Sequence, residues 1–370
     1  MSSSCLDCNT SLAGFLSRVY ECPKCHRKPL CGKCIDYATA RGSFKTGPGA
    51  VKVVSLCFAC FKSECLLDFG AHVDVVGPSL ESGAPTVMLV HGSGSHRRMW
   101  RRIAAELAEA GYRCVLPDLP GHGTRVHEPL TLDSCLAVIR ACYDEYCVGP
   151  ATVVRPIYLG GSFGGYIGME MLSRAPELFS AAIIIVASQR VGAGATLKAR
   201  LALQAMRFFS PRMWTETLAG GMIKMFRGAE QQLNLDDIDD MVVGSQQFFQ
   251  QGVQQVDVLI ASQSEAAMMR YCHPVLYLTG GADHHDMEKA LLSVSLQNET
   301  SALLGTGLAP LTQSIVYEGA SHFVTHDLRF QRRLHGDVRR FCDEVVARNR
   351  PPTAAATAAP SAPAGAAPAA

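Results

Sequence analysis

The sequence predicts an α/β protein in which a layered sheet with helices follows a small cysteine-rich module. Two observations carry this prediction. From about Val73, short apolar segments of strand length alternate with stretches of helical periodicity. Before that point, eight of the fifteen cysteines fall within the first sixty residues. With 370 residues, of which 48% are apolar, the chain is long enough for two folded units and a sizeable core.

The charge balance and the apolar segments exclude two classes of protein. Thirty-four basic and thirty-three acidic side chains leave a net charge of +1, which argues against nucleic-acid binding through bulk charge. The longest apolar run, around Ala181–Ala187, is far shorter than the roughly 18 residues that a membrane span needs. No secretory signal is visible at the N-terminus, so we expect a cytoplasmic protein whose thiols stay reduced. The cysteines then serve metal binding, chemistry or packing, and not disulfides.

The N-terminal cysteines form four C-x-x-C pairs, which are Cys5–Cys8, Cys22–Cys25, Cys31–Cys34 and Cys57–Cys60. Two thiolates at this spacing can bind one tetrahedral zinc through a tight turn, so four pairs predict two closed four-sulfur sites. Only five residues separate Cys25 from Cys31, and one ion bound by the second and third pairs would demand a very tight loop. Interleaved pairing avoids this loop. The first and third pairs then bind one structural zinc, and the second and fourth pairs bind the other.

In this pattern the module resembles a FYVE-type zinc finger, which is a cross-braced fold with two zinc ions. The resemblance covers roughly residues 5–65 of a unit that we place at residues 1–66. It rests on three segments, namely Cys22-Pro-Lys-Cys25, Cys31-Gly-Lys-Cys34-Ile-Asp-Tyr37 and Val53-Val-Ser-Leu-Cys57-Phe-Ala-Cys60-Phe61.

The lipid ligand of such fingers is not carried over. FYVE domains that bind phosphatidylinositol 3-phosphate have R-[RK]-H-H-C-R around the third cysteine, whereas this chain keeps Arg18 and replaces the histidines with Tyr20 and Glu21. Within residues 1–66, nine basic and four acidic side chains, eight bound thiolates and two Zn²⁺ leave a charge of about +1, which attracts an anionic membrane weakly. We therefore expect a zinc-stabilised module that supports the fold or contacts a protein. Any contact with endosomal membranes is expected to be weak and peripheral, without recognition of phosphatidylinositol 3-phosphate.

After residue 67 the predicted elements follow one another in α/β order. They are strand Thr86–Val90, helix Met99–Ala110, strand Tyr112–Leu116, helix Leu132–Tyr146, a strand ending near Gly160, strand Val275–Thr279, strand Ile315–Tyr317 and a final helix. Cys135 and Cys142 fall on the apolar side of the helix over 132–146 and are expected to be buried thiols. A polar helix face without assigned chemistry is marked by Gln246, Gln247, Gln250, Gln251, Gln254 and Gln255.

The segment Gly160-Gly161-Ser162-Phe163-Gly164 lies between an apolar strand and an apparent helix. A G-x-S-x-G motif in that context is a nucleophile elbow, a sharp turn that presents the serine hydroxyl beyond the end of the sheet. Glycines two residues on either side of Ser162 avoid collisions with the neighbouring strand and helix. Ser162 is therefore the predicted nucleophile.

A serine hydroxyl needs a general base and an orienting acid, and these should follow it along the chain. Asp283 comes after strand 275–279, and His322 comes after strand 315–317. Both positions lie at the carboxyl ends of strands, where open α/β sheets bind their ligands. We predict His322 as the general base and Asp283 as the acid, with Asp286 as an alternative acid.

Other histidines near these segments receive no catalytic role. His284 and His285 lack further residues at metal-ligand spacing and are expected at the rim of the site. His326 is expected in the final helix, on its surface.

Residues 70–348 resemble the α/β-hydrolase fold superfamily. The resemblance rests on His91-Gly92, on Asp118-Leu-Pro-Gly-His-Gly123, on the elbow, and on Arg174-Ala-Pro176-Glu-Leu-Phe after it. It implies an oxyanion hole made by the backbone N–H groups of Phe163 and Ser93, with Gly94 as the alternative to Ser93. It also implies a helical cap over about residues 189–272. His91 and His122 are expected to shape the neighbouring loop by hydrogen bonding.

Together these features predict a serine hydrolase that cleaves a carboxylic ester or thioester of a hydrophobic or lipid substrate, through an acyl-enzyme and without a catalytic cofactor. The hydrolase unit is placed at residues 67–348, and residues 349–370 form an alanine- and proline-rich tail that is expected to be disordered. Serine at the elbow argues against epoxide hydrolases and dehalogenases, which carry aspartate there. Two alternatives stay open, a carbon–carbon bond hydrolase with the same triad and an adaptor or scaffold with a vestigial hydrolase fold.

Overall fold

The computed structural model describes most of the region from residue 67 onward and parts of the N-terminal module. The described ranges are 19–30, 35–39, 53–64, 67–187, 200–201, 203–205, 215–216, 235–262, 273–281, 312–320 and 322–350, with residues 4, 6, 11 and 271. Among these residues, no helix has both the length and the apolar character needed to cross a bilayer.

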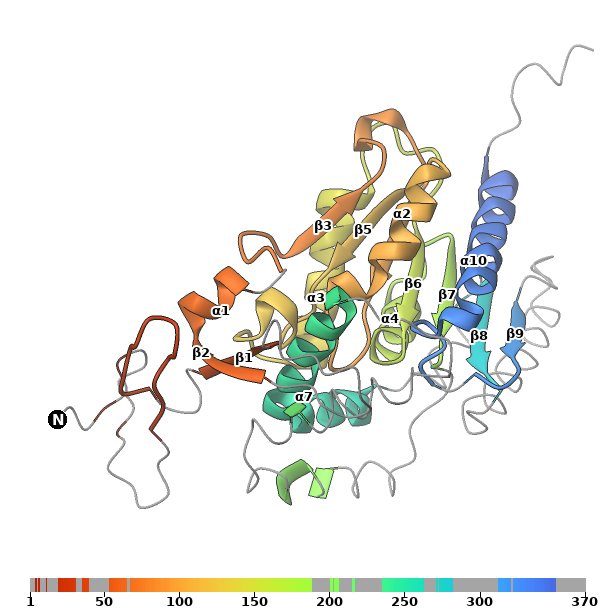
Figure 1. The fold of residues 1–370 in the computed structure, drawn as a ribbon. Helices are drawn as coiled ribbons and strands as arrows, with labels where there is room; N and C mark the ends of the chain where they lie inside the picture. Colours follow the sequence, from red (N-terminus) through yellow and green to blue (C-terminus); the bar gives the residue numbers. More distant parts are fainter. Residues whose placement is uncertain are drawn as a thin grey trace, which may run out of the picture.

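The described strands after residue 67 form one sheet of seven strands in the order β3-β5-β4-β6-β7-β8-β9 (Figure 1). Strand β3 pairs antiparallel with β5 at one edge, and the other neighbours pair in parallel. The predicted α/β class is thereby confirmed. The strands are β3 (Val73–Val76), β4 (Thr86–Val90), β5 (Arg113–Pro117), β6 (Ile157–Gly161), β7 (Ala181–Ile185), β8 (Val275–Gly280) and β9 (Gln313–Tyr317).

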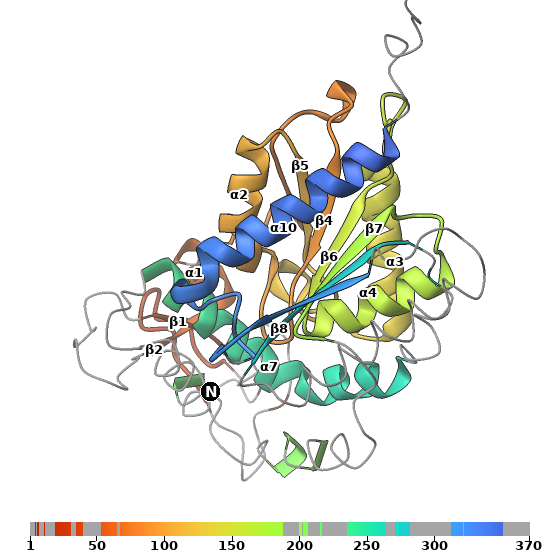
Figure 2. The same ribbon diagram turned by 90° about the vertical axis from the view of Figure 1, so that its right-hand side faces the viewer.

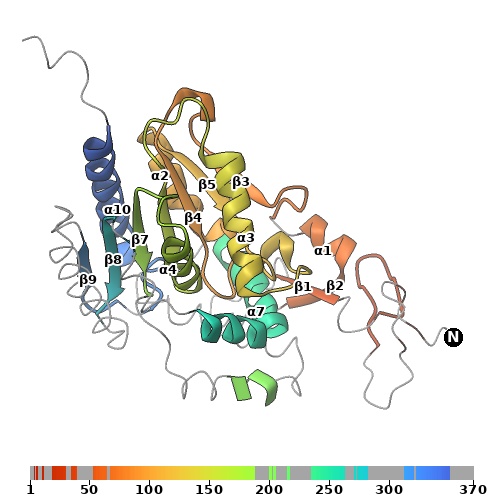
Figure 3. The ribbon, with the colours of Figure 1, turned by 180° about the vertical axis from the view of Figure 1, so that it is seen from behind.

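Helices cover both faces of this sheet, because side chains alternate between the faces along each buried strand. On β4, Val87 and Leu89 join the core beneath α2 (Arg101–Glu109) and α10 (Leu328–Asn349). In Figure 2, α2 lies to the left of the strands and α10 crosses in front of them. Met88 and Val90 join the opposite core beneath α3 (Leu132–Cys142) and α4 (Phe163–Arg174), which cover the face seen in Figure 3.

The helix predicted over 132–146 changes character near its end. Helix α3 ends at Cys142, and a π-helical turn, η4 (Tyr143–Cys147), continues it. Cys135 and Cys142 are buried, as predicted, and burial raises the pKa values of their thiols to about 12 and about 11. These thiols therefore act as core side chains.

Helix α7 (Leu235–Ala261) runs across the carboxyl ends of the strands (Figures 1 and 2). It lies within the segment predicted as a helical cap, most of which falls outside the described residues. The N-terminal module lies beside it, with the antiparallel strands β1 (Ile35–Thr39) and β2 (Val53–Cys57) and the helix α1 (Phe58–Glu64). Strand β1 packs against α7.

Aromatic contacts join the module to the rest of the chain. The Phe58 ring of α1 meets the rings of Phe69 and His127 edge to face, at centroid distances of 5.6 and 5.5 Å. Phe61 contacts Phe69 at 5.8 Å, and the Lys62 ammonium lies 4.9 Å from the Phe58 centroid. Such ring pairs contribute about 0.5–1.5 kcal/mol each beyond their area burial. The module is therefore docked by specific contacts.

A buried ion pair fixes the loops at the β3–β5 edge. Arg97, in the 3-10 turn η2 (Arg97–Trp100), pairs with Asp118 after β5, and their side chains are 1% and 0% exposed. Asp118 also accepts hydrogen bonds from the backbone N–H groups of Arg97 and Thr124, at 2.8 and 2.9 Å. Although burial raises the pKa of Asp118, the Arg97 guanidinium holds it below its ordinary value. The carboxylate stays ionised because all of its oxygens have partners.

We predict that Asp118→Ala lowers the free energy of unfolding by about 3–5 kcal/mol, because it leaves the buried Arg97 charge without its main partner. The matched control is Asp144→Ala, which breaks an exposed pair with Arg140 whose side chains are 53% and 54% exposed. That loss should be about 0.5 kcal/mol or less. Urea unfolding of both variants measures the difference, and equal losses would contradict the assigned role.

Candidate active site

Ser162 occupies the turn between β6 and α4, with a backbone conformation that residues other than glycine rarely adopt. Its φ and ψ are 47° and −112°, and its N–H donates to the Ile185 carbonyl of the adjacent strand at 2.8 Å. A Cβ at Gly164 would lie 2.5 Å from the carbonyl oxygens of Val90 and His91. Only glycine allows this approach, so the local sequence sets the position of the serine at the end of the sheet.

His322 reaches Ser162 from the turn that follows β9. Its Nε2 lies 3.0 Å from the Ser162 Oγ, a distance suited to proton transfer. The sequence separates the two residues by 160 positions, and the adjacent ends of parallel strands bring them together.

The predicted acids lie outside the described residues. The description of β8 and its continuation stops at Gly281, whose N–H donates to the Tyr317 carbonyl of β9 at 2.8 Å. This contact places the start of the loop that carries Asp283 and Asp286 beside the strand that leads to His322. The choice between the two carboxylates stays a prediction, and His284 and His285 lie outside the described residues as well.

The loop after β4 lies directly against the serine. A Cβ at Gly92 would be 3.6 Å from the Ser162 Cβ, and Ser93 and Gly94 line the same pocket as Ser162 and His322. Phe163, the other predicted donor residue, begins α4 next to the serine. The residues predicted to form the oxyanion hole therefore lie next to Ser162.

Two buried histidines shape this loop, as expected. His91 Nε2 accepts a hydrogen bond from the Leu119 N–H at 3.0 Å, so its Nδ1–H donates to the Gly92 carbonyl at 2.9 Å. His122 Nδ1 bonds the Pro120 carbonyl at 2.9 Å. Burial, with a smaller contribution from His122, lowers the pKa of His91 to about 3, and burial lowers the pKa of His122 to about 4. Both rings are therefore neutral and serve as fixed hydrogen-bonding groups.

A pocket of about 570 Å³ opens beside the serine. Apolar side chains from η2, α7 and the turn before α10 line it, namely Met99, Trp100, Met241, Phe248 and Phe323. Arg101, Arg102 and Asp240 line the same pocket, where Arg101 pairs with Asp240 at 2.5 Å. The pocket therefore combines apolar side chains with a few charged ones.

The expectation for His326 is wrong in position and environment. It lies in the turn before α10, which begins at Leu328, and it is part of the pocket wall. Its Nδ1 lies 2.9 Å from the Thr325 Oγ1. The Asp327 side chain accepts a hydrogen bond from the Arg329 N–H at 3.1 Å and caps the helix, so α10 begins after His326.

Three of the six glutamines on the predicted polar face of α7 are buried and the other three are partly buried. Gln247 bonds both the N–H and the carbonyl of Gly123, at 2.9 and 3.0 Å, and Gln251 donates to the Val126 carbonyl at 3.2 Å. Gln255 accepts a hydrogen bond from the Ser93 hydroxyl. Sequence reasoning missed these contacts because a polar helix face ordinarily indicates solvent. The clustering of one amide side chain type over three turns was the available signal.

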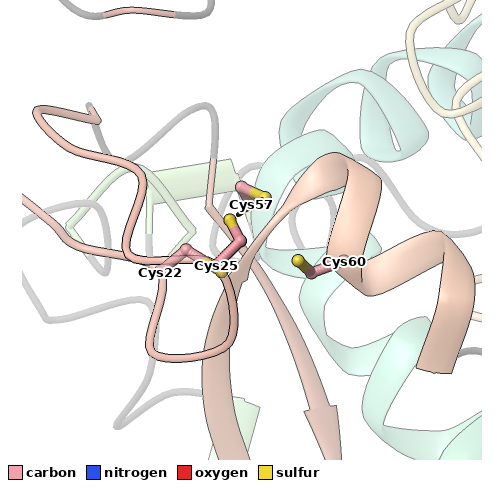
Figure 4. Close-up of side chains that lie close together, drawn as sticks. All are labelled: Cys22, Cys25, Cys57 and Cys60. Atoms are coloured by element: carbon pink, nitrogen blue, oxygen red, sulfur yellow. Dashed lines mark hydrogen bonds between the residues drawn. The ribbon is translucent and has the colours of Figure 1, made fainter.

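The second and fourth cysteine pairs meet in the N-terminal module (Figure 4). Cys22 and Cys25 flank a turn, Cys57 ends β2, and Cys60 lies in the first turn of α1, and the four sulfurs lie within 4.8 Å of one another. The Cys25 and Cys57 sulfurs are 3.6 Å apart. A zinc with bonds of about 2.3 Å to each sulfur separates its ligands by about 3.8 Å, so the cluster fits a tetrahedral ion. Cys5, Cys8, Cys31 and Cys34 lie outside the described residues.

Comparison with known proteins finds relatives for the sheet region. A family model described as the alpha/beta hydrolase family matches residues 87–332. The lipase LipV of Mycobacterium tuberculosis is 34% identical over 115 residues, which cover 31% of this chain and 40% of that protein. The pimeloyl-[acyl-carrier protein] methyl ester esterase of Methylococcus capsulatus is 28% identical over 124 residues, which cover 34% and 45%. The chain thus spans less than half the length of these curated relatives.

Solved structures show the same fold at low sequence identity. A structure from a study of carboxylesterases of the thaumarchaeon Nitrososphaera gargenis has a TM-score of 0.55 and 14% identity, and covers 75% of this chain and 95% of that chain. A thermophilic esterase from Thermogutta terrifontis has a TM-score of 0.54 and 18% identity, with coverage of 74% and 93%. The family match begins at residue 87, so the FYVE-type resemblance of residues 5–65 stays a prediction.

The neutral histidines generate a pH-dependence of stability. In the unfolded chain His91 and His122 bind protons near pH 6.5, whereas in the folded protein their pKa values are about 3 and about 4. The unfolded state therefore binds more protons between these values, and the free energy of unfolding should fall as pH drops from 7 toward 4. At pH 5, one ring with a folded pKa of about 4 accounts for a loss on the order of 2 kcal/mol.

Urea unfolding at pH 7 and pH 5 measures this loss, and His122→Asn should show a smaller loss than the wild type. The control His72→Asn changes an exposed ring that bonds the Thr124 hydroxyl, and it should keep the full pH-dependence. Identical pH-dependence in all three proteins would contradict the assignment.

Proposed function

The chain belongs to the alpha/beta hydrolase family, and on that premise we propose that it is a serine hydrolase that cleaves a carboxylic ester or thioester. Ser162 is the nucleophile and His322 the general base in this proposal. The 3.0 Å approach of the His322 Nε2 to the Ser162 Oγ, at the base of the pocket, carries it. Asp283 is the proposed acid that fixes the imidazole tautomer, and Asp286 is the alternative.

Two half-reactions follow from this arrangement. In the first, His322 takes the hydroxyl proton while the Ser162 oxygen bonds the carbonyl carbon. The tetrahedral intermediate then expels the alcohol or thiol, which leaves with that proton, and an acyl-enzyme remains. In the second, His322 deprotonates a water, which attacks the acyl carbon and releases the carboxylic acid with return of the proton to Ser162. The backbone N–H groups of Ser93 and Phe163 are the proposed donors to the oxyanion in both steps.

The pocket supports a hydrophobic substrate. Met99, Met241 and Phe248 line the pocket that Ser162 also lines, and methionines and aromatic rings adapt to flexible acyl or alkyl chains. The names of the relatives, a lipase and a methyl ester esterase, agree with a substrate of this class.

The alternatives are less well supported. A vestigial fold would have no need to keep a serine in strained geometry, since left-handed backbone at a non-glycine residue costs on the order of 1–3 kcal/mol. A carbon–carbon bond hydrolase would use the same residues, and only its substrates distinguish it from an esterase.

We predict that a fluorophosphonate probe labels the wild-type protein at Ser162 and that Ser162→Ala abolishes both labelling and hydrolysis of p-nitrophenyl esters. His322→Gln should reduce hydrolysis by at least about 10³-fold, because the serine loses its base. The matched control is Ser134→Ala, which changes an exposed serine at the start of α3 and should keep full labelling. Labelling that persists in Ser162→Ala would place the nucleophile elsewhere.

A panel of esters with acyl chains from two to twelve carbons then measures the substrate class. Rising kcat/KM with chain length supports the hydrophobic substrate. Cleavage of a vinylogous diketone without cleavage of any ester would favour the carbon–carbon bond hydrolase.

For the N-terminal module we propose two structural zinc ions, one held by Cys22, Cys25, Cys57 and Cys60 and the other by Cys5, Cys8, Cys31 and Cys34. The geometry of the first set supports this proposal, since its four sulfurs lie within 4.8 Å. A closed four-sulfur site has no open position for substrate, so its contribution is to folding. The contact of Phe58 with Phe69 and His127 supports a module that braces the hydrolase unit more than one that reads a lipid.

We predict two zinc ions per purified chain and one in Cys25→Ser, measured by plasma mass spectrometry. The variant should also unfold at lower temperature, because the metal stabilises the docked module. Cys342→Ala is the control, since this buried cysteine of α10 lies in the sheet core and its loss should leave the zinc content unchanged. A wild-type chain without zinc, or a variant that keeps two ions, would overturn the proposal.

A further inference from the structure

We propose that Gln255 of α7 is a positioning residue that holds the oxyanion-hole peptide of Ser93 in place, an inference that rests on the proposed function. Gln255 lies 162 positions from Ser93, is 1% exposed, and accepts a hydrogen bond from the Ser93 hydroxyl through its Oε1. Buried amide groups are ordinarily held by specific hydrogen bonds. The partner of this one belongs to the loop after β4 (Gly92–Gly94), which is far from α7 in the sequence and lies beside Ser162.

The Gly92–Ser93 peptide is oriented from its other side by His91. The His91 Nδ1–H donates to the Gly92 carbonyl at 2.9 Å, and in a trans peptide the following N–H points the opposite way. This bond therefore turns the Ser93 N–H away from His91. It fixes the rotation of the peptide, while the bond between Ser93 and Gln255 fixes the side chain of the same residue. The donor is thus held at two points.

Gln255 also lies near His122, whose ring packs against the second donor residue. Because His122 Nδ1 bonds the Pro120 carbonyl and the ring is neutral, its Nε2 is an acceptor. The Gln255 side chain lies near this ring, but its Nε2 and the His122 Nε2 have no hydrogen-bond partner among the described residues. The His122 ring packs 5.6 Å from the ring of Phe163. The Gln255 side chain therefore bonds the first donor residue and lies near the ring that packs against the second.

The backbone of α7 makes this placement firm. A Cβ at Gly244 would overlap the carbonyl oxygen of Gly94, so the helix touches the oxyanion loop without an intervening side chain. Asp240 anchors the same helix to Arg98 at 3.1 Å, and Gln247 anchors it to Gly123. Asp240 and Gln247 precede Gln255 on one continuous helix. Because these contacts fix the position of the helix, they also fix the position of the Gln255 amide relative to Ser93.

The test replaces Gln255 with methionine, which keeps the length of the side chain and removes both polar groups. We expect Gln255→Met to lower kcat about 10- to 100-fold with KM changed less than about twofold, since loss of a whole oxyanion donor costs about 10²–10³. The rate of fluorophosphonate labelling, which also forms an oxyanion-like adduct at Ser162, should fall by a similar factor. Gln255→Glu keeps an acceptor for the Ser93 hydroxyl and should retain most of kcat.

Gln251→Met is the matched control, because it removes the same side chain one turn earlier, where it donates to the Val126 carbonyl and not to the oxyanion loop. It should lose thermal stability to a similar extent and keep kcat. Ser93→Ala, which preserves the backbone N–H, should reproduce the loss of Gln255→Met, and the double variant should lose little more than either alone.

Three results would overturn the inference. They are an unchanged kcat in Gln255→Met, an equal loss in Gln251→Met, and strictly additive losses in the double variant. If Gln255→Met does not fold, the Ser93→Ala and Gln255→Glu variants still decide. A wild-type protein that the probe does not label would instead refute the proposed function, so the two failures are distinguishable.

Discussion

Close approach of backbone to backbone at the carboxyl edge of the sheet is the constraint on which the site depends. Gly164 lies against the carbonyls of Val90 and His91, and Gly244 lies against that of Gly94. Side chains at either glycine would push the elbow away from β4 or push α7 away from the loop. The positions of Ser162, of the N–H groups beside it and of helix α7 therefore depend on one another. Dense packing keeps the distances between them within a few tenths of an ångström.

The parts of this arrangement that were predictable are those written as local patterns. The buried run 86–90 and the G-x-S-x-G segment fix the positions of β4 and Ser162 through chain stiffness and turn geometry. His322 followed from the rule that strand ends meet at one edge. The glutamine face could not be read in this way, because the burial of Gln247 or Gln255 depends on which carbonyl or hydroxyl the tertiary fold supplies. The partners of Arg97 and the place of His326 depend in the same way on loops far apart in sequence.

The two units of the chain stabilise their polar interiors by different chemistry. The hydrolase unit keeps the buried charges of Arg97 and Asp118 paired and its buried histidines neutral. In the small module four thiols converge in a geometry that fits a zinc ion, and the proposed ion would stabilise the module where a larger core is lacking. The two units meet at a contact that we call the seam, where the Phe58 ring of the module packs against Phe69 and His127.

That seam has a consequence for anyone who dissects the protein into fragments. A recombinant fragment starting at Leu67 would remove the aromatic partners of the partly buried Phe69 ring, and it would remove the strand β1 that packs against α7. Freshly uncovered aromatic surface favours self-association. We therefore expect soluble expression of the shortened protein to need a polar replacement of Phe69. A fragment of this protein is better designed from the contact surface between the two units than from a position in the sequence alone.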